Sequence, residues 1–257
     1  MGYQHIKTAR SNGIFRIVIC RESKRNALNR ETLTELHEVI KAGLNDPQVK
    51  GMILTGAGER AFVAGADIDE LAGLTSEEGK NLAEDGQSKV FDLIHYADKP
   101  IIAAINGFAL GGGLELAMAC HLRVASHMAK MGLPEVGLGL IPGYGGTQRL
   151  TQLVGRGYAM EMILTGNTIH AEKALQIGLV NHVVPADEIM EKSEEILQDI
   201  FRRSSKAVAA AIRAINAGLD QGRAGFQAEM EEFALRFGTS DLEEGIAAFR
   251  EKRPPSF

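Results

Sequence analysis

The segment from Pro100 to Leu116 reads PIIAAINGFALGGGLEL, and it decides the fold. Its first six residues form a short apolar run, which is typical of a strand buried on both faces. A glycine-rich loop follows this run, and a short helix is predicted from about Gly113. The order of strand, loop and helix predicts one unit of an α/β core.

The segments that precede this stretch follow the same order. Strands are predicted at Ile14–Ile19 and Gly51–Thr55, which are short runs of apolar and β-branched residues. Between them, apolar residues at helical spacing predict a helix over Arg30–Asn45, and the Asn-Asp-Pro sequence that begins at Asn45 ends it. This alternation favours right-handed crossovers and an α/β core.

The last third of the chain is predicted to be mostly helical. Its apolar residues indicate helices at 171–177, 186–201, 205–219 and 226–237. No internal repeat, low-complexity tract or flexible linker separates this part from the rest. We therefore expect a core with the active site over residues 1–190 and a helical carboxy-terminal region over residues 191–257, both in one structural unit.

Composition excludes several classes of protein. Apolar residues make up 45% of the 257 residues and charged ones 24%, which excludes a disordered or fibrous chain. The net charge of −5 argues against nucleic acid as a partner. The uncharged stretches contain glycines and a glutamate, so no membrane span is expected. Cys20 and Cys120 have no metal-like or redox-like spacing, and no leader is evident, so a cytoplasmic protein is predicted.

Two glutamates stand alone in long uncharged stretches. Glu115 is the only charged residue at positions 100–122, and Glu135 is the only one at positions 131–148. Either one alone is better explained as a residue in the first turn of a helix, where the helix dipole favours a carboxylate. Together they indicate a desolvated pair with raised pKa values, which is suited to proton transfer near neutral pH.

Glycine-rich loops supply the other half of a predicted site. The loop Gly107–Gly113 lets a ligand reach backbone N–H groups at the start of the next helix, although the same glycines also suit tight strand-to-helix packing. The segment Ala64–Asp67 is a second, weaker example. The chain lacks the dinucleotide, P-loop, zinc-protease and nucleophile-elbow motifs, and its seven histidines form no ligand set, so no metal site is predicted.

Four motifs in this order and spacing resemble those of the enoyl-CoA hydratase (crotonase) family. They are AGADI at 64–68, NGFALGGGLEL at 106–116, PEVG at 134–137 and IPGYGGTQRL at 141–150. The resemblance covers nearly the whole chain, from KRNALN at 24–29 to AFREKR at 248–253. It implies a crotonase-like spiral of repeated ββα units, a helical region used in trimerisation, and a trimer or a hexamer formed from two trimers.

The resemblance also implies a site. The backbone N–H groups of Ala66 and Gly112 are expected to form an oxyanion hole for the thioester oxygen of an acyl-CoA. Glu115 and Glu135 are expected to hold and activate water, with Gly143 beside that water. No metal or redox cofactor is implied, because coenzyme A is part of the substrate. Which glutamate is protonated stays open.

Contacts to coenzyme A are implied at an early turn, around the first glycine motif and near the end of the chain. The residues are Arg25, Ala27, Leu28, Ala64, Asp67, Ile68, Phe249 and Lys252. Basic side chains among them would meet the phosphates. Asp69 occupies a position that is often lysine in the family, which removes one expected basic contact.

The predicted activity is reversible addition of water to a 2-enoyl-CoA, which gives a 3-hydroxyacyl-CoA in fatty-acid or branched-chain metabolism. The alternatives are another acyl-CoA reaction of the family, such as enoyl-CoA isomerisation or methylglutaconyl-CoA hydration, and an RNA-binding role. Relatives with other reactions commonly alter one of the two glutamates. Because both are present, hydration is favoured.

Overall fold

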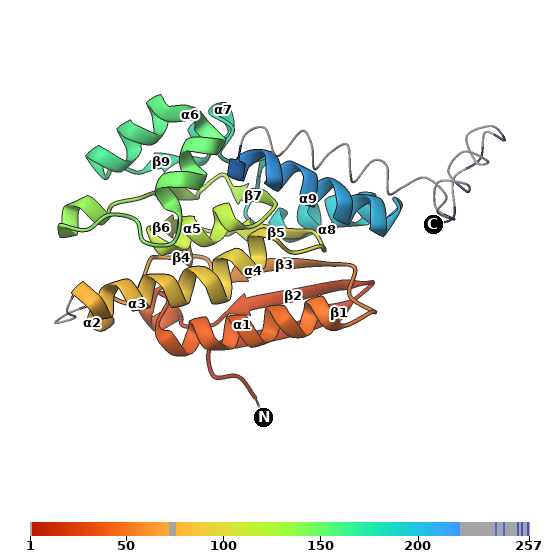
Figure 1. Cartoon of the computed structure of the whole chain (residues 1–257), viewed down its shortest axis with the longest axis horizontal. Helices are drawn as coiled ribbons and strands as arrows, with labels where there is room; N and C mark the ends of the chain where they lie inside the picture. Colours follow the sequence, from red (N-terminus) through yellow and green to blue (C-terminus); the bar gives the residue numbers. More distant parts are fainter. Residues whose placement is uncertain are drawn as a thin grey trace.

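The strands form two sheets (Figure 1). The computed structural model describes residues 2–71 and 76–221 and, near the end of the chain, residues 240, 244, 251, 253 and 256. In this part, the order of the larger sheet is β1 (Ile6–Ser11), β2 (Ile14–Ile19), β3 (Gly51–Gly56), β5 (Ile101–Ile105), β7 (Leu122–Ser126) and β10 (His182–Val184). The order of the smaller sheet is β4 (Ala61–Val63), β6 (Phe108–Leu110), β8 (Lys130–Gly132) and β9 (Ile169–His170). The pairs β1–β2 and β8–β9 are antiparallel, and the other neighbours are parallel.

The same strand–strand–helix unit recurs along the chain. β3 and β4 lead into α2 (Ile68–Leu71) and α3 (Ser76–Gly86), and β5 and β6 lead into α5 (Gly112–Ala119). β7 and β8 lead into the 3₁₀ turn η3 (Glu135–Leu138) and α6 (Gly146–Thr165). In each unit the first strand joins the larger sheet and the second joins the smaller one. The predicted α/β class and the spiral of ββα units are therefore confirmed.

Both faces of the larger sheet are covered. On β3, Met52 and Leu54 belong to an apolar cluster that includes Leu36 of α1 (Arg30–Asn45). Ile53 points to the other face and belongs to a second cluster with Leu197 of α8 (Ile189–Phe201). Because neighbouring residues of a strand point to opposite faces, a strand buried on both sides needs an uninterrupted apolar run. This explains the run that begins at Pro100.

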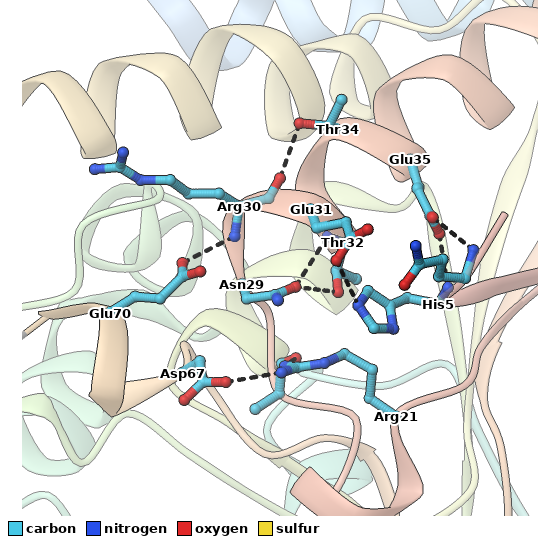
Figure 2. A network of polar contacts seen from close by, with 12 residues as sticks. His5, Arg21, Asn29, Arg30, Glu31, Thr32, Thr34, Glu35, Asp67 and Glu70 are labelled. Carbon is cyan, nitrogen blue, oxygen red and sulfur yellow. Dashed lines mark hydrogen bonds and ion pairs between the residues drawn. The ribbon is translucent and has the colours of Figure 1, made fainter.

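The start of α1 is tied to the chain that follows β4. Asn29 caps the helix, because its side-chain oxygen accepts the N–H of Thr32 at 2.9 Å. The carboxylate of Glu70 accepts the N–H of Arg30 at 2.9 Å (Figure 2). The predicted bounds of this helix, Arg30–Asn45, are confirmed.

The helices of the last third are also confirmed where the structure describes them. The ends of α7 (Ala171–Gln176), α8 and α9 (Ser205–Gln221) lie within three residues of the predicted ends. α8 begins at Ile189 because residues 185–188 form a turn first, in which the N–H of Glu188 donates to the carbonyl of Pro185 at 3.0 Å. The helix predicted at 226–237 lies outside the described residues, and the division at 190/191 stays a prediction. Across the described ranges, no helix has the length and apolar character that a membrane crossing needs.

Candidate active site

A cavity of about 510 Å³ lies where α3, the start of α5 and the loop between β8 and α6 meet. Seven of the predicted site residues line it: Ala64, Ala66, Ile68, Gly112, Glu115, Glu135 and Gly143. The two lone glutamates, 20 positions apart in sequence, thus share one cavity with both predicted backbone donors.

The N–H groups of Ala66 and Gly112 lie side by side on the cavity wall. Leu28 donates to the carbonyl of Gly65 at 2.8 Å and accepts the N–H of Asp67 at 2.7 Å. Leu28 is thus paired with Ala66 through hydrogen bonds to Gly65 and Asp67, the residues on either side of Ala66. Since successive residues of an extended chain point their N–H groups in opposite directions, the N–H of Ala66 points away from Leu28. Gly112 is the first residue of α5, so its N–H has no acceptor within the helix.

The two donors are also close to each other. A Cβ atom placed on Gly112 would lie 3.5 Å from the nitrogen of Ala66. Within residues 2–71 and 76–221, neither N–H has a hydrogen-bond acceptor. The α5 dipole adds partial positive charge at this end of the helix. This arrangement suits a ligand oxygen that carries or develops negative charge.

Glu115 lies on the first turn of α5 and is 1% exposed. Its Oε1 accepts the N–H groups of Tyr144 at 2.8 Å and Gly146 at 2.7 Å. Burial raises the pKa of Glu115 to about 7, although these two donors oppose the rise, and the charge of Glu135 adds to it. No described residue gives a hydrogen bond to the other oxygen, Oε2, which is therefore the one available to a ligand.

The turn that binds Glu115 depends on glycine. Gly145 has φ of +86°, a conformation that glycine adopts without steric cost. A Cβ on Gly146 would lie 2.8 Å from Oε1 of Glu115, so a side chain there would displace the carboxylate. The ring of Tyr144 stacks on Phe91 with centroids 4.6 Å apart, which also holds the turn.

Glu135 is the first residue of η3, and its carboxylate lies next to Gly111 in the cavity wall. A Cβ on Gly111 would lie 2.7 Å from Oε1 of Glu135, and Gly111 has φ of +52°, so only glycine fits there. Oε2 of Glu135 is buried and has no hydrogen-bond partner among the described residues. Burial raises the pKa of Glu135. The two carboxylates therefore differ: Glu115 receives two N–H donors, which favour its ionised form, and the buried oxygen of Glu135 receives none.

The raised pKa of Glu115 predicts a pH-dependent stability cost. In the unfolded chain a glutamate ionises near 4.5, whereas in the folded protein Glu115 ionises at about 7. The folded protein therefore loses stability as the pH rises from about 4.5 to 7. Because the neutral amide of Glu115→Gln avoids this cost, we expect the variant to exceed the wild type by about 2–3 kcal/mol in unfolding free energy at pH 8, and by much less at pH 5. Urea unfolding at the two pH values measures this, and an equal difference at both would contradict the assignment.

The residues expected to contact coenzyme A fall into two groups. Ala64 and Ile68 line the cavity, whereas Arg25, Ala27, Leu28 and Asp67 do not. The early turn is joined to the cavity wall, since the N–H of Ala64 donates to the carbonyl of Arg25 at 3.1 Å. The side chain of Arg25 lines a separate hollow with Arg60.

Asp67 is held by a neighbouring cation. Its carboxylate pairs with the guanidinium of Arg21 at 2.9 Å, and this hydrogen bond keeps the pKa of Asp67 below its usual value (Figure 2). The pair fixes the residue that follows Ala66. Phe249 and Lys252 lie outside the described residues. Among the described side chains, no group of three or more His, Cys, Asp or Glu is placed to bind a metal ion.

Some functional residues were not predicted from the sequence. The N–H groups of Tyr144 and Gly146 bind Glu115, and the only available signal was the density of glycines after Pro142. The apolar wall of the cavity includes Leu82 and Ala83 of α3 together with Leu138, Leu140 and Ile141. With Gly79, the wall residues on α3 follow helical spacing. This spacing indicates that one face of the helix is covered, but it does not indicate that the face lines a cavity.

Comparison with known proteins identifies one family. The profile of the Enoyl-CoA hydratase/isomerase family matches residues 9–257. The chain is 44% identical to a crotonyl-CoA hydratase of Syntrophomonas wolfei, over 100% of this chain and 99% of that protein. It is 47% identical to a short-chain-enoyl-CoA hydratase of Clostridium acetobutylicum, over 92% of this chain and 91% of that protein.

A solved structure shares the fold. The crystal structure of an enoyl-CoA hydratase from Bacillus anthracis is 39% identical, covers 99% of both chains and has a TM-score of 0.92. The family profile, the two relatives and this structure each cover more than nine tenths of the chain. The chain therefore belongs to the enoyl-CoA hydratase/isomerase (crotonase) family.

Proposed function

We propose that the protein is an enoyl-CoA hydratase, which adds water reversibly across the 2,3 double bond of a 2-enoyl-CoA and forms a 3-hydroxyacyl-CoA. One observation carries the proposal: two N–H donors and two carboxylates line the same cavity. The names of the relatives from Syntrophomonas wolfei and Clostridium acetobutylicum support it.

The thioester oxygen binds the N–H groups of Ala66 and Gly112. When water adds to C3, negative charge moves through the conjugated system onto this oxygen. Each preorganised donor contributes about 3 kcal/mol of transition-state stabilisation in such sites. No cofactor is needed, because the thioester itself accepts the charge.

The two carboxylates transfer the protons. Glu115 is the base that takes a proton from the attacking water, since its two N–H donors favour the carboxylate. The water oxygen bonds to C3, and the protonated Glu135 gives its proton to C2. The addition leaves Glu115 protonated and Glu135 ionised, and transfer of one proton from Glu115 to Glu135, directly or through water, restores the starting state. The pair is therefore best described by its joint titration.

The proposal is tested with crotonyl-CoA. Loss of the absorbance of the conjugated thioester, together with formation of 3-hydroxybutyryl-CoA, is the expected result. Failure to hydrate crotonyl-CoA, with conversion of a 3-enoyl-CoA to its 2-enoyl isomer instead, would replace hydration by isomerisation. Hydration confined to a branched, carboxylated 2-enoyl-CoA would favour the methylglutaconyl-CoA alternative.

The pH dependence of hydration reports on Glu115. Because the reaction needs Glu115 ionised and Glu135 protonated, kcat/KM should pass through a maximum and fall about tenfold per pH unit on the acid side, where Glu115, whose pKa is raised to about 7, becomes protonated. Initial rates with crotonyl-CoA from pH 5 to 9 measure this limb. A profile that stays level down to pH 5 would exclude a base with a raised pKa.

The assembly follows from the family and is proposed on that basis. We propose a trimer, or a hexamer formed from two trimers, with the helical carboxy-terminal region in the contacts between subunits. Sedimentation equilibrium of the full chain distinguishes these states from a monomer. A cytoplasmic location is likewise part of the proposal.

A further inference from the structure

Arg149, on α6, lies behind the turn that binds Glu115. The residue is 7% exposed. Its Nη1 donates to the carbonyl of Tyr144 at 2.9 Å, and its Nη2 pairs with Asp92 at 3.1 Å. Tyr144 gives its own N–H to Glu115. The turn is therefore bound by Glu115 on one side and by Arg149 on the other.

The contact between Arg149 and the turn is tight. A Cβ on Gly145 would lie 2.2 Å from Nη1 of Arg149, so the guanidinium fills the space that a side chain at position 145 would need. Asp92 begins α4 (Asp92–His95) and also accepts a hydrogen bond from Gln87. Gln87 begins a π-helical segment (Gln87–Phe91) that joins α3, a wall of the cavity, to α4. Arg149 thus connects the turn to a second element of the site.

We propose that Arg149, held by Asp92, is a positioning residue for Glu115. It fixes the turn so that the N–H groups of Tyr144 and Gly146 bind Oε1 and leave Oε2 for the water that is added. The role of Glu115 in this inference rests on the proposed hydratase function. Arg149 itself does not line the cavity and acts through the turn.

The charges around Glu115 give this inference a measurable consequence. Glu135 on η3 raises the pKa of Glu115, and Arg149 on α6 lowers it. The phenol of Tyr144 also interacts electrostatically with Glu115 and stays neutral, since burial raises its pKa to about 12. Arg149 supplies the positive charge among these groups. Its removal is therefore expected to raise the pKa of Glu115 further.

Two substitutions of Arg149 separate its effect on the position of Glu115 from the effect of its charge. In Arg149→Gln, we expect kcat for crotonyl-CoA to fall about 10- to 100-fold, with KM within about threefold, because the base is misplaced and the thioester contacts remain. The acid limb of the pH profile should move up by about half a unit to one unit. Arg149→Lys keeps the charge, so its acid limb should stay at the wild-type pH, with a partial recovery of kcat.

Arg123→Gln is the matched control. Arg123 is also a buried arginine that donates to carbonyls, those of Cys120 and Leu179, each at 2.7 Å. Its loss should lower the stability and leave the acid limb unchanged. An Arg149→Gln variant whose activity falls only with the fraction of folded protein, with the limb at the wild-type pH, would overturn the inference.

A measurement without substrate distinguishes failure of this inference from failure of the proposed function. Urea unfolding of the wild type, Arg149→Gln, Glu115→Gln and the double variant gives the coupling between the two positions. We expect a favourable coupling that is larger at pH 8 than at pH 5, where Glu115 is neutral. Absence of this coupling overturns the positioning role whatever the activity, whereas failure of the wild type to hydrate crotonyl-CoA overturns the proposed function alone.

Discussion

Glu115→Gln and Glu135→Gln are each expected to lower kcat for hydration of crotonyl-CoA by about 10²- to 10⁴-fold, the usual contribution of a positioned acid or base. Glutamine fills nearly the same volume as glutamate but cannot accept or supply the proton. Because the donors at Ala66 and Gly112 are untouched, KM should change little. Initial rates at saturating and limiting substrate measure both parameters.

The two variants also control for each other. In each variant the cavity still contains one of the two carboxylates. A general loss of substrate binding would therefore appear as a raised KM in both variants. The double variant should be little slower than the slower single variant, since both residues act in one proton-transfer cycle. If either single variant keeps wild-type kcat, the residue has no part in proton transfer.

Gly112→Pro is expected to lower kcat/KM by about 10²- to 10³-fold, the effect of losing one oxyanion donor. Gly112 is the first residue of α5, a position at which helices accept proline. The substitution removes the N–H that faces the cavity and costs the helix no hydrogen bond of its own. Initial rates with crotonyl-CoA measure the loss of kcat/KM, and circular dichroism shows whether the variant keeps its fold.

Gly112→Ala is the matched control for this change. Its Cβ would lie 3.5 Å from the nitrogen of Ala66 and 3.6 Å from the ring of Tyr144, which are ordinary contacts, and its N–H remains. We expect it to keep most of the activity. Replacing the amide of residue 112 by an ester removes the donor without adding a proline ring and should act in the same direction. Equal activity of Gly112→Pro and Gly112→Ala would show that this N–H binds no oxyanion.

Local signals in the sequence predicted the central elements well. The run after Pro100 is uninterrupted and apolar, and the helix at Arg30–Asn45 has apolar residues at helical spacing; the structure confirms both. β1 has no such signal, since Ile6 is its one buried residue and the other five are exposed. α6 was not predicted either, because glycines interrupt its apolar pattern and Gly155 has a non-helical conformation inside it.

The sequence predicts some parts of the site and not others. Glu115 and Glu135 are marked in the sequence because each is the one charged residue of a long uncharged stretch. The structure buries Glu115 and leaves Glu135 half-buried. The backbone donors at Ala66 and Gly112 are predicted by the family resemblance alone. Every residue except proline has a backbone N–H, so residue type does not indicate which N–H binds a ligand. The contacts of Arg149 with Tyr144 and Asp92 depend on where the start of α6 lies relative to the turn and to α4, and sequence spacing does not determine that placement.

The most direct test of the proposed mechanism is a crystal structure of the Glu115→Gln variant with crotonyl-CoA bound. We expect the thioester oxygen to lie about 2.7–3.1 Å from the nitrogens of both Ala66 and Gly112. We also expect C2 and C3 to lie between the side chains of residues 115 and 135. A thioester oxygen bound elsewhere, or an acyl group remote from these two side chains, would contradict the proposed mechanism.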